Sequence, residues 1–353
     1  MTLTFDQALQ DSEQFRKRHL ILGNGFSIAC RGDIFHYGSL FAEADFSSCP
    51  EARAAFDALG TQDFESVINA LQKAAALMAV YGDGSGELPG RLLGHAEALK
   101  EILLNTIAAK HPDIPGEITD ERFAACRRFL ANFLAGDKAG HVFSLNYDLL
   151  LYWALMHREA DGEEPVLLNH SDGFGNDEDD PDAEYVVWQG ETGAHSADVH
   201  FLHGALHLFD SGAELKKYTW VRTGTRLIDQ ARAAMALGYF PVFVAEGTSD
   251  QKKNKIRHNA YLYQGLKVLT ANAKTGTHCF FIFGHSLAEN DDHILKRIGR
   301  GKCRKIYVGL YGDPSSKENR DIRQRASALV ELRNERNPLD VAFYRAGSAN
   351  VWG

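Results

Sequence analysis

The chain has 353 residues, 44% of them apolar and 24% charged, so it can bury a large core and is neither disordered nor fibrous in composition. Its formal net charge of −9 excludes a non-specific nucleic-acid binder, which needs a basic surface. No apolar run reaches the ~20 residues of a membrane-spanning helix, and the first residues lack the pattern of a secretory signal. We therefore expect a cytoplasmic protein with neither nucleic acid nor membrane as a direct partner.

The first predicted strand covers residues 19–23 and ends in a glycine-containing turn that opens a helix. This turn consists of Gly23, Asn24, Gly25, Phe26 and Ser27. Glycine at such a place lets backbone N–H groups approach a pyrophosphate at the positive helix end. The turn predicts a phosphate cradle, and a plain strand-to-helix turn is the alternative. Because no second strand with a ribose-binding acid follows ~20 residues later, a hydride-transferring dehydrogenase is disfavoured.

The segment 39–137 contains no convincing strand. Three stretches within it, 64–80, 94–111 and 121–136, have the apolar spacing of amphipathic helices. We interpret 39–137 as a helical insert subdomain, with 1–38 and 138–353 forming one α/β domain.

Short apolar runs alternate with helical patterns in the rest of the chain. The predicted strands are 141–145, 185–189, 199–203, 241–246, 278–284 and 305–312, and the predicted helices are 227–238, 255–273 and 291–299. Continuously apolar strands are typical of parallel sheets covered on both faces. The alternation predicts an α/β fold, a Rossmann-like parallel sheet with helices on both faces. The acidic stretch 161–184 is interpreted as a solvated loop rather than a metal site.

Polar residues follow the predicted strand 141–145, where open α/β sheets bind their ligands. Asn146 can donate to and accept from ribose hydroxyls or a water molecule. Asp148 is a second candidate for nucleotide binding, and its alternative role is to cap the following helix.

The predicted strand 199–203 ends in His203 and Gly204. A histidine at a strand end, followed by a glycine that lets a ligand come close, suits a general base with a pKa near neutrality. Alternation along the strand places His200 on the opposite face, which argues against a joint metal site. The five scattered cysteines form no C-x-x-C pair, so neither a disulfide framework nor a structural zinc site is expected.

The order of these motifs resembles the sirtuin family across most of the sheet domain. A glycine turn with a serine, a strand end with N-x-D, a strand end with H-G, the segment PVFVAEG and the segment FGHSL follow one another as in that family. The resemblance implies NAD as the ligand. The nucleotide-binding residues that it implies are the turn from Gly23 to Ser27 with Asp33, Asn146, Asp148, Gly204, Gly284, His285 and Ser286.

Two departures separate the chain from the protein deacylases of that family. The segment 205–240 contains no cysteine where they carry a four-cysteine zinc module, and Leu145 stands where they have glutamine. Both features resemble divergent bacterial sirtuin-like proteins that hydrolyse NAD, often in response to phage infection. The resemblance implies an NAD glycohydrolase with NAD as substrate, no metal, and control by self-assembly or by a partner protein.

Breaking the bond between nicotinamide and ribose releases a neutral base, so the site needs no strong general acid. We expect Asn146 to position the ribose and the attacking water, and His203 to withdraw a proton. Positioned proton transfer contributes ~10²- to 10⁴-fold. Three alternatives stay open: a module that binds or senses NAD or ADP-ribose without cutting it, a protein deacylase, and a scaffold without a ligand.

Overall fold

The computed structural model describes residues 2–33, 40–81, 87–109, 111–157, 166–174, 185–188, 190, 197–218, 225–244 and 248–353. Of the acidic stretch 161–184, residues 161–165 and 175–184 lie outside this set, so most of the predicted solvated loop is not described. Within the described part of the chain, we find no helix whose length and hydropathy suit a membrane span.

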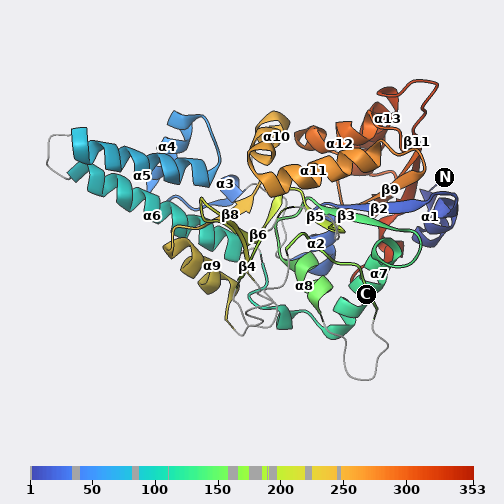
Figure 1. The fold of residues 1–353 in the computed structure, drawn as a ribbon, viewed down its shortest axis with the longest axis horizontal. Coiled ribbons are helices and arrows are strands. Elements are labelled where there is room, and N and C mark those ends of the chain that lie inside the picture. Colours follow the sequence, from blue (N-terminus) through green and yellow to red (C-terminus); the bar gives the residue numbers. More distant parts are fainter. Residues whose placement is uncertain are drawn as a thin grey trace.

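Seven strands form one sheet in which all neighbours are parallel (Figure 1). In spatial order they are β1 (Thr2–Leu3), β11 (Asp340–Arg345), β10 (Lys305–Leu310), β9 (His278–Phe283), β2 (Lys17–Leu22), β3 (Ala139–Ser144) and β5 (Val199–Phe201). The predicted parallel sheet is therefore confirmed. β1 and β11, at one edge, escaped the sequence analysis.

Both faces of this sheet are covered, which explains the continuous apolar runs in its central strands, such as residues 20–22 of β2 and residues 279–283 of β9. On one face, α7 (Asp120–Leu134) packs Phe133 against Phe281 of β9, with ring centroids 5.2 Å apart. On the other face, α11 (Ala260–Ala273) approaches β5 so closely that a Cβ on Gly265 would lie 3.4 Å from that of His200. The prediction of a Rossmann-like sheet with helices on both faces holds.

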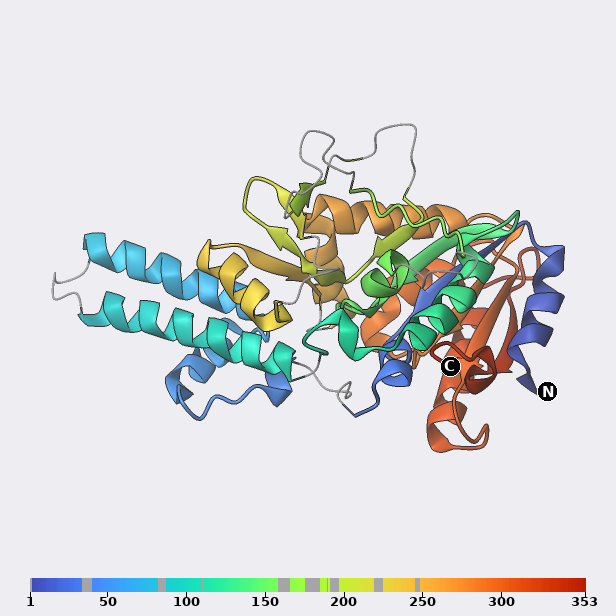
Figure 2. The ribbon, with the colours of Figure 1, turned by 90° about the horizontal axis from the view of Figure 1, so that it is seen from below.

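Helices α3 (Leu40–Glu43), α4 (Pro50–Leu59), α5 (Phe64–Tyr81) and α6 (Glu87–Ala108) occupy most of the predicted insert. The two longest, α5 and α6, lie side by side and extend away from the sheet (Figures 1 and 2). The fifth helix of that segment, α7, instead packs on β2 and β3.

Two predicted strands do not belong to the parallel sheet. β4 (Tyr185–Val187) and β8 (Phe240–Phe243) form a second, antiparallel sheet with β6 (Gly204–Asp210) and β7 (Leu215–Tyr218), in the order β4-β7-β6-β8. The sequence did not indicate this second sheet, because a short apolar run does not specify which strand will pair with it.

The predicted helix 255–273 is two helices, α10 (Ser249–His258) and α11. Asn259 breaks the run because its extended backbone lets its side chain accept the N–H of Leu262 as an N-cap. The remaining helices are α1 (Phe5–Asp11), α2 (Gly25–Cys30), α8 (Leu150–Met156), α9 (Leu227–Ala236), α12 (Asp292–Gly299) and α13 (Lys317–Glu331).

Candidate functional site

Four neighbouring parallel strands carry the predicted site residues directly after their carboxyl ends. In the order of the sheet, β9 leads to Gly284, β2 to Gly23, β3 to Asn146 and β5 to His203. Because the strands are parallel, these four loops meet at one edge, the place where open α/β sheets hold their ligands. The proposition that the four motifs converge is thus confirmed.

The side chain of Asn146 joins the loops after β2 and β3. Its Nδ2 donates to the main-chain oxygen of Gly23 at 3.0 Å and to Oγ of Ser27 at 3.1 Å. Since a carbonyl can only accept, this contact fixes which amide atom is nitrogen. Both donors are used, and among the described residues Oδ1 of Asn146 has no partner. Asn146 can therefore accept from a ligand but not donate to one.

Asp148 belongs to the same hydrogen-bond network. Its Oδ2 accepts the hydroxyl of Ser27, and its Oδ1 accepts the N–H of Leu150 at the start of α8, at 2.9 Å. Burial raises the pKa of Asp148 to about 6, although both hydrogen bonds oppose that rise. The N-cap residue of α8 is Leu149 and no side chain caps the helix, so Asp148 is not the cap that we considered as its alternative role, and its carboxylate instead joins Ser27 to the first N–H of α8.

Gly25, in the turn after β2, and Gly284, directly after β9, allow these two loops to pack closely against each other. A Cβ on Gly25 would lie 2.5 Å from Cα of Gly284, and a Cβ on Gly284 would lie 2.6 Å from the nitrogen of Phe26. Gly284 also has a positive φ of 67°. Close packing of two loops therefore explains these glycines without a ligand.

The backbone N–H groups of the turn are mostly occupied. Those of Gly23, Gly25, Phe26 and Ser27 donate to Phe283, Gly284, Gly23 and Asn24, at 2.8 to 3.0 Å. The expectation that they cradle a pyrophosphate is wrong for this conformation, because a donor already inside a protein hydrogen bond is not free for a phosphate. The side chain of Asn24 does not cap α2, and it forms no hydrogen bond within the described residues.

His203 lies beside Leu145, the residue before Asn146. Its Nδ1 donates to the main-chain oxygen of Leu145 at 3.2 Å, which leaves the lone pair of the neutral ring on Nε2. That atom faces Nε2 of His293 at 3.1 Å. Burial lowers the pKa of His203 to about 3, so the predicted pKa near neutrality was wrong.

An ionic cluster surrounds the Nε2 atom of His203. Oδ1 of Asp291 lies 3.8 Å from it and 2.9 Å from Nζ of Lys252. Oδ2 of Asp291 accepts from Nε2 of His285 at 3.0 Å, and Nδ1 of His285 accepts the N–H of Leu287 at 2.9 Å. Although burial alone would raise the pKa of Asp291, the hydrogen bond from His285 and the nearby positive charge hold it well below its ordinary value.

Ser249 and Lys252 reach this cluster because of the position at which α10 begins. Thr248 and Gln251 form a capping box, in which each side chain accepts the backbone N–H of the other, and this starts α10. Ser249 and Lys252, one turn apart on α10, then point at the same cluster. Oγ of Ser249 accepts the N–H of His293 at 2.8 Å and lies 3.3 Å from its Nδ1.

Two groups of described residues bring three metal-ligand atoms within 4.8 Å of one another. One consists of Cys49, Glu51 and His95, where the Glu51 side chain is 72% exposed. The other consists of His203, Asp291 and His293, whose side chains are far more buried. No metal was expected from the sequence, because the cysteines form no C-x-x-C pair and because His200 and His203 alternate along one strand.

Four predicted nucleotide-binding residues lie outside this network. Phe26 is fully buried, and its main-chain oxygen accepts Nε1 of Trp352 at 2.9 Å. Asp33 follows the far end of α2 and forms an ion pair with Arg31. Gly204 has a φ of 74°, and a Cβ there would lie 1.8 Å from the oxygen of Val242. Pairing of β6 with β8 therefore accounts for this glycine.

The fourth, Ser286, is half-buried, and its main-chain oxygen accepts Nη1 of Arg325 at 2.9 Å. Conversely, the sequence analysis missed Ser249, Lys252, Asp291 and His293. Asp291 and His293 follow the segment FGHSL within a few residues, and that was the one sequence signal for them.

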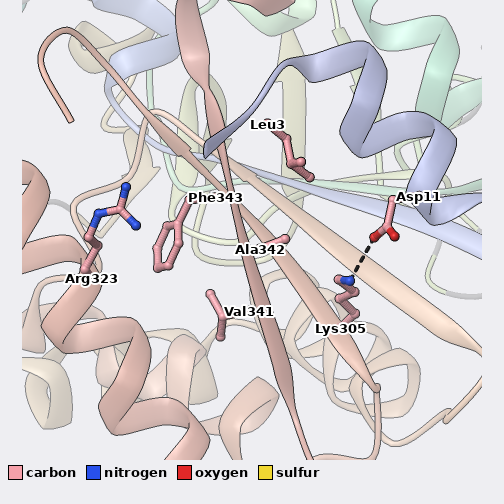
Figure 3. A pocket seen from close by; sticks show the side chains of 7 residues that line it. All are labelled: Leu3, Asp11, Lys305, Arg323, Val341, Ala342 and Phe343. Carbon is pink, nitrogen blue, oxygen red and sulfur yellow. Dashed lines mark ion pairs between the residues drawn. The ribbon is translucent and has the colours of Figure 1, made fainter. Parts of the chain in front are cut away.

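A separate cavity of about 510 Å³ lies beside β1, β10 and β11, near the edge of the sheet away from β5 (Figure 3). It is lined by Leu3, Asp11, Lys305, Arg323, Val341, Ala342 and Phe343. These residues come from α1, α13 and the strands β1, β10 and β11, none of which contributes to the network around Asn146 and His203.

Comparison with known proteins places nearly the whole chain in one family. A family model described as a domain of unknown function, DUF4917, matches residues 20–352. No curated protein matches the sequence.

Proposed function

The chain belongs to the DUF4917 family, and for this member we propose hydrolysis of NAD⁺ at the bond between nicotinamide and ribose. The products are nicotinamide, ADP-ribose and a proton. The observation that carries the proposal is the meeting of four loops after β9, β2, β3 and β5, in which His203 is hydrogen-bonded to the main-chain oxygen of Leu145, the residue before Asn146. The sirtuin-like order of these motifs along the chain supports the same conclusion.

The two central side chains have complementary abilities. Oδ1 of Asn146 has no partner among the described residues, so it accepts a hydrogen bond from the attacking water or a ribose hydroxyl. Nε2 of His203 carries the lone pair of the ring, because Nδ1 is held by Leu145. It accepts the proton that water loses as its oxygen bonds to the ribose carbon. The bonding electrons leave with nicotinamide, which departs neutral.

The cluster around Asp291 gives the site its electrostatic character. The carboxylate is held by His285 and Lys252. A fixed negative charge near the reacting ribose stabilises the positive charge that develops there as nicotinamide departs. Asp291 thus supplies the electrostatic stabilisation that Asn146 and His203 do not.

One observation favours a second candidate, a module that binds NAD⁺ or ADP-ribose without cleaving it. Nε2 of His203 lies 3.1 Å from Nε2 of His293, so in the described conformation the proton acceptor already has a partner. A site of this kind binds a nucleotide but releases no nicotinamide.

The deciding experiment is nicotinamide release from NAD⁺ by the purified chain. We expect turnover with the unaltered protein and a decrease of about 10²-fold or more with His203→Ala and with Asn146→Ala. His258→Ala, at an exposed position on α10, is the matched control and should keep full activity. Thermal stabilisation by NAD⁺ without any nicotinamide would select the binding module. Full activity of a folded His203→Ala protein would refute the catalytic assignment.

A further inference from the structure

The two histidines at the centre of the cluster face each other through the same kind of nitrogen. Nε2 of His203 and Nε2 of His293 are 3.1 Å apart, and Oδ1 of Asp291 lies 3.8 Å from the first of them. Two ligands of one tetrahedral Zn²⁺ at bond lengths of about 2.0–2.2 Å are about 3.3 Å apart. The two nitrogens are thus already close to the separation that one ion requires, and all three ligand atoms lie within 4.8 Å of one another.

From this arrangement we infer that His203, His293 and Asp291 bind a divalent transition-metal ion, with Zn²⁺ as the best match. Two imidazole nitrogens and one carboxylate oxygen form a donor set that zinc accepts and that magnesium and calcium do not favour. Three protein ligands leave a fourth position of the ion for water or a ligand. The site is distinct from any four-cysteine module.

Each of the three ligands has an outer partner, as ligands in metal sites nearly always do. Nδ1 of His203 donates to Leu145, which directs Nε2 to the centre. Nδ1 of His293 lies 3.3 Å from the hydroxyl of Ser249. Oδ2 of Asp291 is held by His285 at 3.0 Å, which leaves Oδ1 on the side of the two histidines.

The ammonium group of Lys252 competes with a metal ion for the carboxylate of Asp291. Its Nζ lies 2.9 Å from Oδ1 of Asp291, and its side chain is 5% exposed. The ammonium forms an ion pair with the carboxylate when no metal ion is bound and repels an ion that enters. Removing this charge should therefore strengthen metal binding, whereas a purely structural cluster would gain nothing from the change.

The second group of donors, Cys49, Glu51 and His95, is the internal alternative for a bound ion. Its Glu51 is largely exposed, and N···O between His95 and Glu51 is 3.8 Å. A thiolate ligand there would give Co²⁺ a sulfur charge-transfer band, which a site of two histidines and one aspartate cannot produce.

The test is calorimetric titration of Zn²⁺ into the full chain after treatment with a chelator, together with visible spectra of the Co²⁺ form. We expect one ion per chain, affinity lower by about 100-fold or more with His293→Ala, and affinity about tenfold higher with Lys252→Met. Cys49→Ser and His258→Ala are the controls and should bind like the unaltered chain. Excess Mg²⁺ should not compete.

The inference is overturned if Zn²⁺ does not bind, if Cys49→Ser abolishes binding, or if the Co²⁺ form shows a thiolate band. The spectrum of the unaltered protein decides the matter even where His293→Ala does not fold.

A further expectation rests on the proposed function and is tested by a separate measurement of nicotinamide release. A metal on Nε2 of His203 removes the proton acceptor, so Zn²⁺ should inhibit nicotinamide release. Zinc binding without inhibition leaves the metal site in place and removes His203 from catalysis.

Discussion

The hydroxyl of Ser27 donates to the carboxylate of Asp148, a residue 121 positions later in the chain. This contact links the turn after β2 to the start of α8. Nδ2 of Asn146 donates to the same hydroxyl, so Ser27 transmits the position of Asp148 to the amide that we place beside the ribose.

Replacing Ser27 by alanine should cost more stability at high pH than at low pH. The pKa of Asp148 is raised to about 6 by burial, so its carboxyl is ionised at pH 8 and mostly protonated at pH 5. A hydrogen bond to a charged group contributes about 1.5–3 kcal/mol. We expect Ser27→Ala to lose that amount at pH 8 and clearly less at pH 5, as measured by urea unfolding.

The matched control is Ser66→Ala, since Oγ of Ser66 donates to Asp63 at an exposed position. It should change stability by less than about 0.5 kcal/mol at both pH values. An equal loss at both pH values for Ser27→Ala would contradict the assigned charge of Asp148.

A side chain at Gly284 should unfold the site. Gly284→Ala adds a strained backbone at φ 67° and a Cβ 2.6 Å from the nitrogen of Phe26. Gly312 has a φ of 70° with nothing within 4 Å of an added Cβ, so it isolates the backbone cost. We expect Gly312→Ala to lower the free energy of unfolding by about 1–2 kcal/mol and Gly284→Ala to lower it by at least about 3 kcal/mol. Equal unfolding midpoints in denaturant would show that the two loops do not pack as described.

His207 should be better replaced by phenylalanine. It is fully buried, neither ring nitrogen has a hydrogen-bond partner among the described residues, and its ring stacks on Tyr152 at 4.3 Å. Removing an unsatisfied polar group while keeping a flat ring should stabilise the protein by about 1–2 kcal/mol. His111→Phe is the counterpart, because Nε2 of His111 accepts from Leu149 and Nδ1 donates to Pro112. That variant should be destabilised, and a stabilised His111→Phe would refute the hydrogen-bond assignment.

Stability should decline in mild acid because of a row of histidines across four strands. His278, His19, His141 and His200 lie on adjacent strands. Burial lowers the pKa of each, and the neighbouring His141 lowers the pKa values of the other three further. For His200 the native pKa is about 3. The unfolded chain takes up a proton below its ordinary pKa of about 6.5, while the native ring stays neutral.

The contribution of His200 is therefore complete above pH 6.5 and is lost as the pH falls toward 3. Below pH 6.5 this group should remove about 1.4 kcal/mol per pH unit from the free energy of unfolding. His200→Leu should flatten the decline between pH 6 and pH 4 by that amount, as read from urea unfolding at each pH. An unchanged slope would mean that His200 is protonated in the native state.

The sequence was sufficient for the parallel sheet, because central strands such as β2 and β9 are apolar on both faces and end in glycine or polar residues. It was not sufficient for the second sheet, since β4 and β8 show the same apolar pattern but pair antiparallel with β6 and β7. Strand β11, which pairs with the edge strand β1, was missed because only one of its residues is fully buried, which leaves a weak apolar pattern.

The sequence predicted only part of the site, because local motifs do not specify how distant elements pack. Asn146 and His203 stand at strand ends, where position alone marks a ligand-binding edge. Lys252, Asp291 and His293 come from helices whose relation to the sheet depends on packing. The low pKa of His203 likewise reflects its burial under those helices, which no local motif encodes.

The turn after β2 receives its last support from Trp352, whose ring lies against Phe26 and whose indole N–H binds the Phe26 carbonyl. These two residues are 326 positions apart. During synthesis, the loops after β2 and β3 emerge from the ribosome long before either their neighbour β9 or this indole. A nascent chain therefore carries the separate loops of the site before the contact between Trp352 and Phe26 can form.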